Sequence, residues 1–249
     1  MNSDVERPYS EAPVADEPAI TAEAAPVELE TGANSAKALH RPRILIAVDH
    51  TLVAEACKKL LEPEFEVVGI VADGRELLRA CDSLSPDVVV TDIAMHSLNG
   101  LDAGERAKLC NPDLRIIYLT MLPDPDLAAE ALRRGGSGYL LKTSAASELV
   151  KAVKEVLAGR VYMSPGITRD GLADFLRSHR REPNRALTPR QREVLQLLAE
   201  GRSMKEAASV LNLTTSTVAF HKYRIMASLG LHTNADLVQY AIRNFIIAA

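Results

Sequence analysis

Five short apolar runs, each followed by a stretch with helical periodicity, divide residues 43–158 of this chain into repeating units. The runs are rich in Val, Ile and Leu, as is typical of strands that are covered on both faces. They comprise Ile44–Val48, Phe65–Val71, Pro86–Asp92, Leu114–Thr120 and Tyr139–Lys142. Strands that alternate with helices predict an α/β fold, a doubly wound five-stranded parallel sheet with helices on both faces.

Polar side chains occur where four of these runs end. Asp49 follows the first run, Asp92 ends the third, Thr120 ends the fourth and Lys142 ends the fifth. Ligands of such sheets bind at the carboxyl ends of the strands, so we expect the four residues to lie together. Carboxylates hold a hard cation such as Mg²⁺, and a cation with a lysine neutralises a phosphoryl group. The group therefore predicts phosphoryl chemistry centred on Asp92.

Each of these residues also has a simpler interpretation. An aspartate after a strand is often a turn residue or a helix cap, and a single lysine such as Lys142 is often only solvated. The phosphoryl hypothesis depends on four such residues at successive strand ends within one five-fold pattern.

Charge is distributed unevenly along the 249 residues, whose formal net charge is −4. Residues 1–40 hold eight acidic and two basic residues, a net charge of −6, and are rich in Ala, Pro and Glu. We expect a disordered tail there, either solvated or serving as a partner-binding arm. Residues 185–249 hold eight basic and four acidic residues, a net charge of +4, which favours an acidic partner such as DNA.

Capping motifs predict four helices in the C-terminal part. Thr188-Pro189-Arg190-Gln191 and Ser203-Met204-Lys205-Glu206 are capping boxes, and Thr214 or Thr215 and then Thr233 begin the other two helices. The second and third helices are about three residues apart, which is the spacing of a helix-turn-helix. With the local positive charge, this predicts binding of double-stranded DNA.

The third of these helices has two different faces. Val218, His221, Ile225 and Leu229 recur at helical spacing and are expected to pack inward, His221 as a core residue rather than a ligand. The residues expected to face outward toward DNA are Thr215, Thr217, Ala219, Phe220, Lys222, Tyr223 and Arg224. For the two aromatic residues, packing against a neighbouring helix or a partner subunit is the alternative.

Residues 43–158 resemble the receiver domain of two-component response regulators, whose fold is flavodoxin-like. The resemblance rests on Ile44–His50, Asp92-x-x-Met95-x-x-x-Asn99-Gly100, Thr120 and Gly138–Lys142. It implies that a sensor histidine kinase phosphorylates Asp92, with Thr120 and Lys142 contacting the phosphoryl group and Tyr139 changing rotamer on activation. It also implies Mg²⁺ bound by Asp49, Asp92 and the Ala94 backbone carbonyl.

The chain departs from the receiver pattern at several positions. Val48 stands where the family has a first acidic residue, His96 replaces a usual Pro, and Thr143 follows Lys142 where Pro or Asp is common. Cation affinity follows the charge of the ligands, so the loss of one carboxylate predicts a weakened Mg²⁺ site and weakened phosphorylation.

Residues 187–247 resemble the LuxR-type (NarL-like) helix-turn-helix. The signature runs are Leu187–Leu195, Leu198–Gly201 and Thr217-Val218-x-x-His221. The resemblance implies that the helix Thr215–Leu229 enters the major groove and that the last helix forms the dimer contact; a simple core helix is the alternative. Ala219 replaces a residue that is commonly Lys, so one DNA contact is expected to be lost.

Taken together, these features predict a disordered acidic tail (1–40), a receiver domain (41–160), a linker (161–186) with a short helix around Leu172–Leu176, and a DNA-binding domain (187–249). No apolar run approaches the ~18 residues of a membrane span, there is no secretion signal, and the three cysteines match no metal or redox spacing. We therefore expect a cytoplasmic protein, and the LuxR-type resemblance implies a homodimer when active.

Three functions remain open at this point. The first is a transcription regulator controlled by phosphorylation of Asp92. The second is a constitutive DNA-binding regulator whose degenerate receiver serves as a protein-interaction module, and Val48 favours it. The third, a small flavodoxin-like enzyme, is disfavoured because the sequence contains no Gly-rich phosphate loop.

Overall fold

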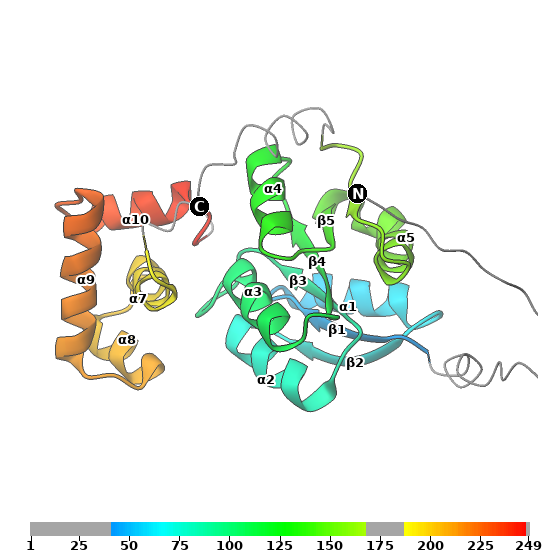
Figure 1. Ribbon diagram of the computed structural model, residues 1–249, viewed down its shortest axis with the longest axis horizontal. Helices are drawn as coiled ribbons and strands as arrows, with labels where there is room; N and C mark the ends of the chain where they lie inside the picture. Colours follow the sequence, from blue (N-terminus) through cyan, green and yellow to red (C-terminus); the bar gives the residue numbers. More distant parts are fainter. Residues whose placement is uncertain (1–40, 168–186, 248–249) are drawn as a thin grey trace, which may run out of the picture. The chain divides into compact units, whose positions relative to one another are not determined.

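The computed structural model describes residues 41–167 and 187–247, which belong to one compact unit. The expected N-terminal tail and the short helix expected around Leu172–Leu176 lie outside the described residues. Figure 1 shows the described elements in sequence colours.

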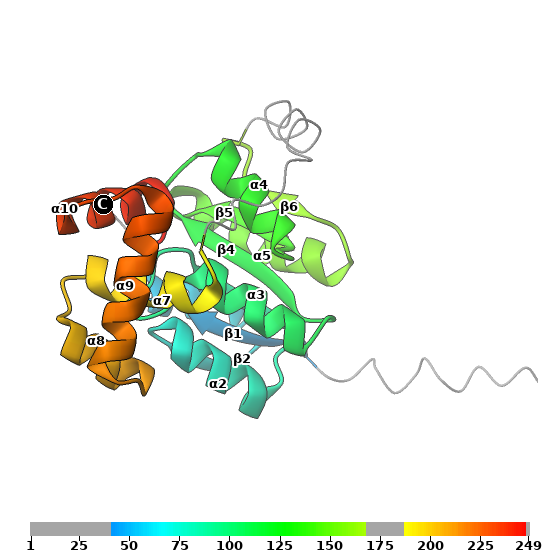
Figure 2. The same cartoon turned by 60° about the vertical axis from the view of Figure 1, so that its left-hand side comes forward.

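A parallel sheet forms the first part of the unit (Figure 2). Its strand order is β2-β1-β3-β4-β5-β6, and every neighbouring pair is parallel. The strands span Arg43–Ala47 (β1), Glu66–Val71 (β2), Val88–Asp92 (β3), Arg115–Thr120 (β4), Gly138–Leu141 (β5) and Tyr162–Met163 (β6). The order reverses between β1 and β3, so a crevice for ligands is expected at their carboxyl ends.

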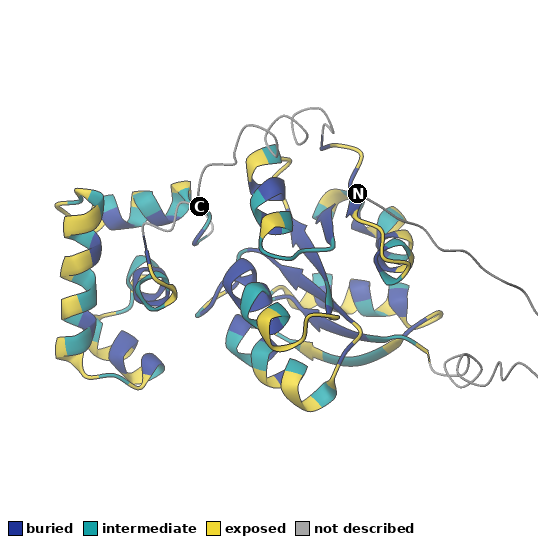
Figure 3. Ribbon diagram, in the orientation of Figure 1, coloured by how far each residue is buried: buried dark blue, intermediate teal, exposed yellow. Residues whose placement is uncertain are grey.

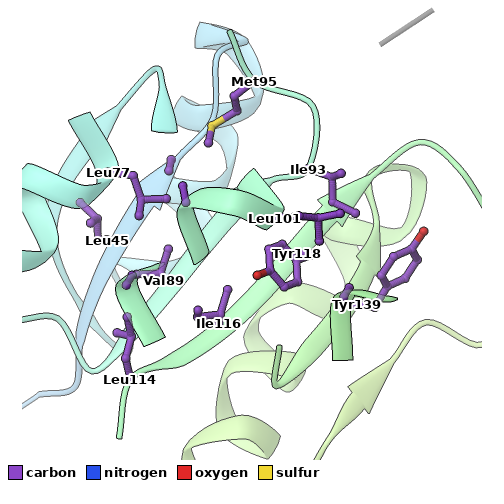
Figure 4. Close-up of a cluster of buried hydrophobic side chains, with 14 of the residues drawn as sticks. Leu45, Leu77, Val89, Ile93, Met95, Leu101, Leu114, Ile116, Tyr118 and Tyr139 are labelled. Atoms are coloured by element: carbon purple, nitrogen blue, oxygen red, sulfur yellow. The ribbon is translucent and has the colours of Figure 1, made fainter. Parts of the chain in front are cut away.

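Helices cover both faces of the sheet, as the alternating pattern predicted. One face carries α1 (Thr51–Leu61) and α5 (Ala145–Leu157), whose apolar residues pack in one cluster with alternate residues of β1, β3, β4 and β5. The other face carries α2 (Gly74–Leu84), α3 (Gly100–Cys110) and α4 (Pro125–Arg133). Figure 4 shows this second cluster, in which Leu45, Val89 and Ile116 from the strands meet Leu77 and Leu101 from the helices.

The doubly wound parallel sheet is confirmed, but the expectation of five strands was wrong by one. Tyr162 and Met163, in the segment expected to be linker, form β6 beside β5. Ser164 secures this strand, because its backbone N–H donates to Tyr139 O at 3.0 Å and its Oγ accepts from Leu141 N at 3.0 Å. Two residues are too short for a recognisable strand period, so the pairing depends on the unsatisfied edge of β5.

Four helices make up the C-terminal part of the described chain, as expected. They are α7 (Pro189–Ala199), α8 (Met204–Leu211), α9 (Thr215–Leu229) and α10 (Asn234–Arg243). The capping boxes at Thr188 and Ser203 are both present, and Thr214 and Thr233 cap α9 and α10. Their apolar faces enclose a separate cluster that includes Val194, Leu211, Val218, Ile225 and Leu237.

Candidate phosphorylation and metal site and candidate DNA interface

Three of the residues expected at the sheet edge are brought together in the structure. Asp92 ends β3 and is only 1% exposed, and Lys142 follows β5. Lys142 Nζ lies 2.6 Å from Asp92 Oδ2 and 2.6 Å from Oδ1. Asp49 follows β1, and ligand atoms of Asp49, His50 and Asp92 all lie within 4.8 Å of one another. The parallel register puts the ends of β1, β3 and β5 at the same edge of the sheet, with β4 between β3 and β5.

Asp92 lies where a negative charge is costly. Burial raises the pKa of Asp92 from its ordinary 3.8 to about 6; Lys142 opposes this change and the neighbouring Asp49 adds to it. Burial disfavours the charged form, and a second carboxylate repels it, so further positive charge at this edge would be stabilising. The electrostatics thus suit a bound cation.

The donor set also fits Mg²⁺. Asp49 and Asp92 supply carboxylate oxygens, the ligands that a hard cation prefers. His50 is the residue of the group that sequence analysis did not single out. Its Nδ1 lies 2.6 Å from Asp49 Oδ1, so the imidazole orients that carboxylate. When bound, the cation would neutralise charge on a transferring phosphoryl group.

Thr120 and Tyr139 lie together on the neighbouring strands β4 and β5. Thr120 Oγ1 accepts a hydrogen bond from Leu122 N at 3.1 Å, and Tyr139 OH donates to Leu122 O at 2.9 Å. Both side chains are buried. The structure therefore places the expected hydroxyl at the end of β4. The expected aromatic residue, Tyr139, is buried and belongs to the cluster drawn in Figure 4.

Val48 is part of the core and not of the polar edge. It is 2% exposed and packs in the cluster formed with α1 and α5. Its backbone N–H donates to Val71 O at 3.0 Å, which extends the pairing of β1 with β2. The missing carboxylate has thus been replaced by an apolar contact.

The helix α9 presents an unusual outer face. Val218 and Ile225 are buried, whereas Phe220 and Tyr223 are 55% and 64% exposed. The guanidinium of Arg224 lies 5.6 Å from the centre of the Phe220 ring, which positions both side chains. Figure 3 shows exposed residues along this helix. Of the other expected contact residues, Thr215 is exposed and Thr217, Ala219 and Lys222 are half-buried.

Sequence reasoning missed a polar row on α7. Glu193, Gln196 and Glu200 recur at helical spacing, a pattern that usually indicates a solvated face. In the structure Glu193 and Gln196 are buried and contact residues of the sheet domain. No local signal distinguishes such a row from a solvated one, because the partner lies some hundred residues away in sequence.

Comparison with known proteins assigns both parts of the chain. Residues 44–154 match the response regulator receiver domain, and residues 185–241 match the bacterial regulatory proteins of the luxR family. The transcriptional regulatory protein MctR of Rhizobium johnstonii is 33% identical over 83% of this chain and 95% of its own length. The oxygen regulatory protein NreC of Staphylococcus carnosus is 33% identical over 82% of this chain and 99% of its own length.

Solved structures give the same assignment. The RcsB response regulator of Salmonella typhimurium is 29% identical, covers 81% of this chain and 97% of its own, and superimposes with a TM-score of 0.55. A LuxR-family two-component response regulator from Aurantimonas is 34% identical, and the match covers 54% of this chain and 96% of that chain with a TM-score of 0.51. A flavodoxin-like receiver followed by a helix-turn-helix domain defines a DNA-binding response regulator.

The chain belongs to the NarL/LuxR-type response regulators, and its family role is transcription regulation. Across residues 41–167 and 187–247, none of the helices combines the length and the apolar character that crossing a membrane requires.

Proposed function

We propose that this protein controls transcription by binding double-stranded DNA through α9, and that phosphorylation of Asp92 by a sensor histidine kinase modulates that binding. The observation that carries the proposal is the group at the sheet edge. A buried carboxylate held at 2.6 Å by Lys142, with a second carboxylate beside it, matches the needs of a phosphoacceptor and its cation.

Asp92 acts as the nucleophile in this proposal. One of its oxygens attacks the phosphorus of a phosphohistidine or small phosphodonor, and the bond from phosphorus to the donor breaks. Mg²⁺ held by Asp49, Asp92 and the Ala94 carbonyl would neutralise the phosphoryl oxygens. Lys142 would pair with the phosphoryl group, and Thr120 would donate a hydrogen bond to it. Tyr139 would then change rotamer, which requires breaking its hydrogen bond to Leu122 O.

The DNA interface in this proposal comprises Thr215, Thr217, Ala219, Phe220, Lys222, Tyr223 and Arg224. Lys222 and Arg224 suit phosphates or guanine edges, and the exposed aromatic rings suit thymine methyl groups. The similar RcsB response regulator of Salmonella typhimurium shows conformational dynamism for DNA interaction. The same proposal includes a homodimer that binds paired half-sites. It also includes domain boundaries after residues 40, 160 and 186.

One experiment tests both halves of the proposal. Purified protein is treated with Mg²⁺ and a small-molecule phosphodonor, the adduct is measured by intact mass, and binding to genomic fragments is measured with and without the donor. We expect an adduct on the native protein, none on Asp92→Asn, and tighter DNA binding after treatment. An adduct that persists in Asp92→Asn would contradict the assignment of the phosphoacceptor, and DNA binding in neither state would contradict the whole proposal.

The burial of Val48 favours a second candidate. In this alternative the receiver carries no phosphoryl chemistry and serves as a protein-interaction module of a constitutive DNA-binding regulator. Equal DNA binding in both states, with no adduct on the native protein, would support it.

A further inference from the structure

The helices α2 and α3 pack side by side on one face of the sheet. Because α2 follows β2 and α3 follows β3, and both cover the same face of a parallel sheet, the two helices run in the same direction. Figure 1 and Figure 2 show them as neighbours. At their N-terminal ends they approach closely, since a Cβ placed on Gly74 would lie 3.1 Å from the Cβ of Ala103.

The register of the two helices pairs two cysteines. Seven residues make almost two full turns, so the same helix face returns after seven residues with a drift of about 20°. Seven residues beyond the contact at the N-terminal ends, α2 carries Cys81, and α3 carries Cys110, its last residue. Four residues beyond that contact, Leu78 and Ala107 both pack in the apolar cluster of this face. The contact between the helices therefore continues as far as the cysteines.

The two thiols influence each other and differ in exposure. Burial raises the pKa of Cys81 to about 11, and the Cys110 thiol close to it adds to the rise. Cys110 is exposed, whereas Cys81 is half-buried. An oxidant from solvent can thus reach Cys110 first, and a shielded second thiol beside it can resolve the oxidised product.

The third cysteine lies on the other face of the sheet. Cys57 is 2% exposed and packs in the cluster formed with α1 and α5. The sheet separates it from the cysteines of α2 and α3. Cys57 is therefore shielded from an oxidant and provides an internal reference within the same chain.

We propose that Cys81 and Cys110 form a reversible oxidation site, at which a peroxide converts the two thiols into a disulfide that joins α2 to α3. The Cys110 sulfur attacks one oxygen of hydrogen peroxide, the O–O bond breaks, and water leaves with Cys110 as a sulfenic acid. The Cys81 sulfur then attacks the Cys110 sulfur, and its proton goes to the departing hydroxide. In sum, two thiols and one hydrogen peroxide give one disulfide and two waters.

The disulfide encloses the strand that carries Asp92. Residues 82–109, which lie between the two cysteines, include β3 and the loop that joins it to α3. Closing this segment into a loop restricts the unfolded chain, so the oxidised protein should be the more stable form. In a reducing compartment a bond of this kind is transient and reports an oxidant. The inference does not depend on the proposed phosphorylation of Asp92.

Peptide mapping of the full chain tests the site. Native protein is treated with hydrogen peroxide, the remaining thiols are alkylated under denaturing conditions, and the chain is digested without a reductant. We expect the loss of two hydrogen atoms in the intact mass, a peptide linked through Cys81 and Cys110, and alkylation of Cys57 alone. Dithiothreitol should return all three thiols. Cys57→Ser is the matched control and should form the same linked peptide, whereas Cys110→Ser should form none.

Three results would overturn the pairing. They are a native chain that keeps all its thiols after treatment, a linked peptide that contains Cys57, and a disulfide that joins Cys110 to a second copy of the chain. The order of the steps has its own test, because Cys81→Ser should accumulate a sulfenic acid on Cys110 that dimedone labels. Equal labelling of Cys81 in Cys110→Ser would overturn that order.

Urea denaturation shows whether the bond forms between helices in their native places. The oxidised native chain should unfold at a higher urea concentration than the reduced chain, and dithiothreitol should reverse the shift. In Cys110→Ser, a substitution at an exposed position, peroxide should leave the midpoint unchanged. A linked peptide together with a lowered or unchanged midpoint in the native chain would mean that the bond distorts the helices, and would overturn the proposed native pairing.

Discussion

Val48 and Asp92 are neighbours at one sheet edge with opposite environments. The side chain of Val48 points into the apolar cluster under α1 and α5, and that of Asp92 meets Lys142. Successive residues of a strand alternate between faces, so a single position decides whether a carboxylate joins the site or disturbs the core. Val48 therefore packs in the core and supplies no carboxylate to a bound cation.

Replacing Val48 with aspartate should separate these two effects. We expect Val48→Asp to bind Mg²⁺ more tightly and to lower the free energy of unfolding by about 3–5 kcal/mol, because an uncompensated charge enters an apolar cluster. Val48→Asn is the matched control: it buries an uncharged polar group, so it should lose about 1–3 kcal/mol with no gain in affinity. Calorimetric Mg²⁺ titration and urea denaturation measure the two quantities. An Asp variant whose affinity equals that of the Asn variant would show that this position cannot reach the cation.

The short strand β6 links the sheet to the segment beyond it. Its main anchor is Ser164, whose Oγ accepts from Leu141 N and donates to Glu148 Oε2 at 2.7 Å. Tyr162 OH donates to the same carboxylate at 3.0 Å. The edge of β5, next to Lys142, is thereby closed by a two-residue strand and one side-chain network.

Removing the Ser164 hydroxyl should weaken this closure. Ser164→Ala leaves the buried Leu141 N–H without its partner, so the free energy of unfolding should fall by about 1–3 kcal/mol. Ser147→Ala removes an exposed hydroxyl that bonds within its own helix turn and should change stability by no more than about 0.5 kcal/mol. Thermal or urea unfolding of the two variants makes the comparison. Equal stabilities would argue against β6 as a structural part of the sheet.

Acid should open the contact between the two domains only at low pH. Burial alone would raise the pKa of Glu193, but bonds from Arg106 and Arg75 bring it below the ordinary 4.5. A carboxyl group with a lowered pKa adds stability above its ordinary pKa, and that stability is lost as pH falls through the lowered value. Arg75, Arg106 and Arg190 face this carboxylate.

Amide exchange at Asn99, whose N–H donates to Gln196 Oε1, corrected for its intrinsic pH dependence, should therefore be constant from about pH 8 to 5 and rise below about pH 4.5. Glu193→Gln is the control and should show no such step, because its side chain does not titrate. A step near pH 6 in the native chain would assign the opening to another group.

Sequence alone determined the two domains, their helices and the residues at the strand ends. Strand runs, helical periods and capping boxes are local, so Thr188, Ser203 and Thr233 could be identified as caps before any coordinates. The parallel pattern also implied that Asp49, Asp92 and Lys142 share one edge, because carboxyl ends of parallel strands meet there. The exposed aromatic residues of α9 followed from its helical period.

Only the tertiary structure decided β6, the burial of Val48 in the core and the role of the polar row on α7. Two residues carry no period, and β6 exists because the β5 edge offers unpaired backbone groups. In the sequence, Gln196 is only one of several polar residues on a helix. Its hydrogen bonds to Met95 and Asn99, which lie about a hundred residues away, exist only in the folded chain. Such contacts depend on how separately folded parts meet, and a local pattern of residue types carries no information about the partner surface.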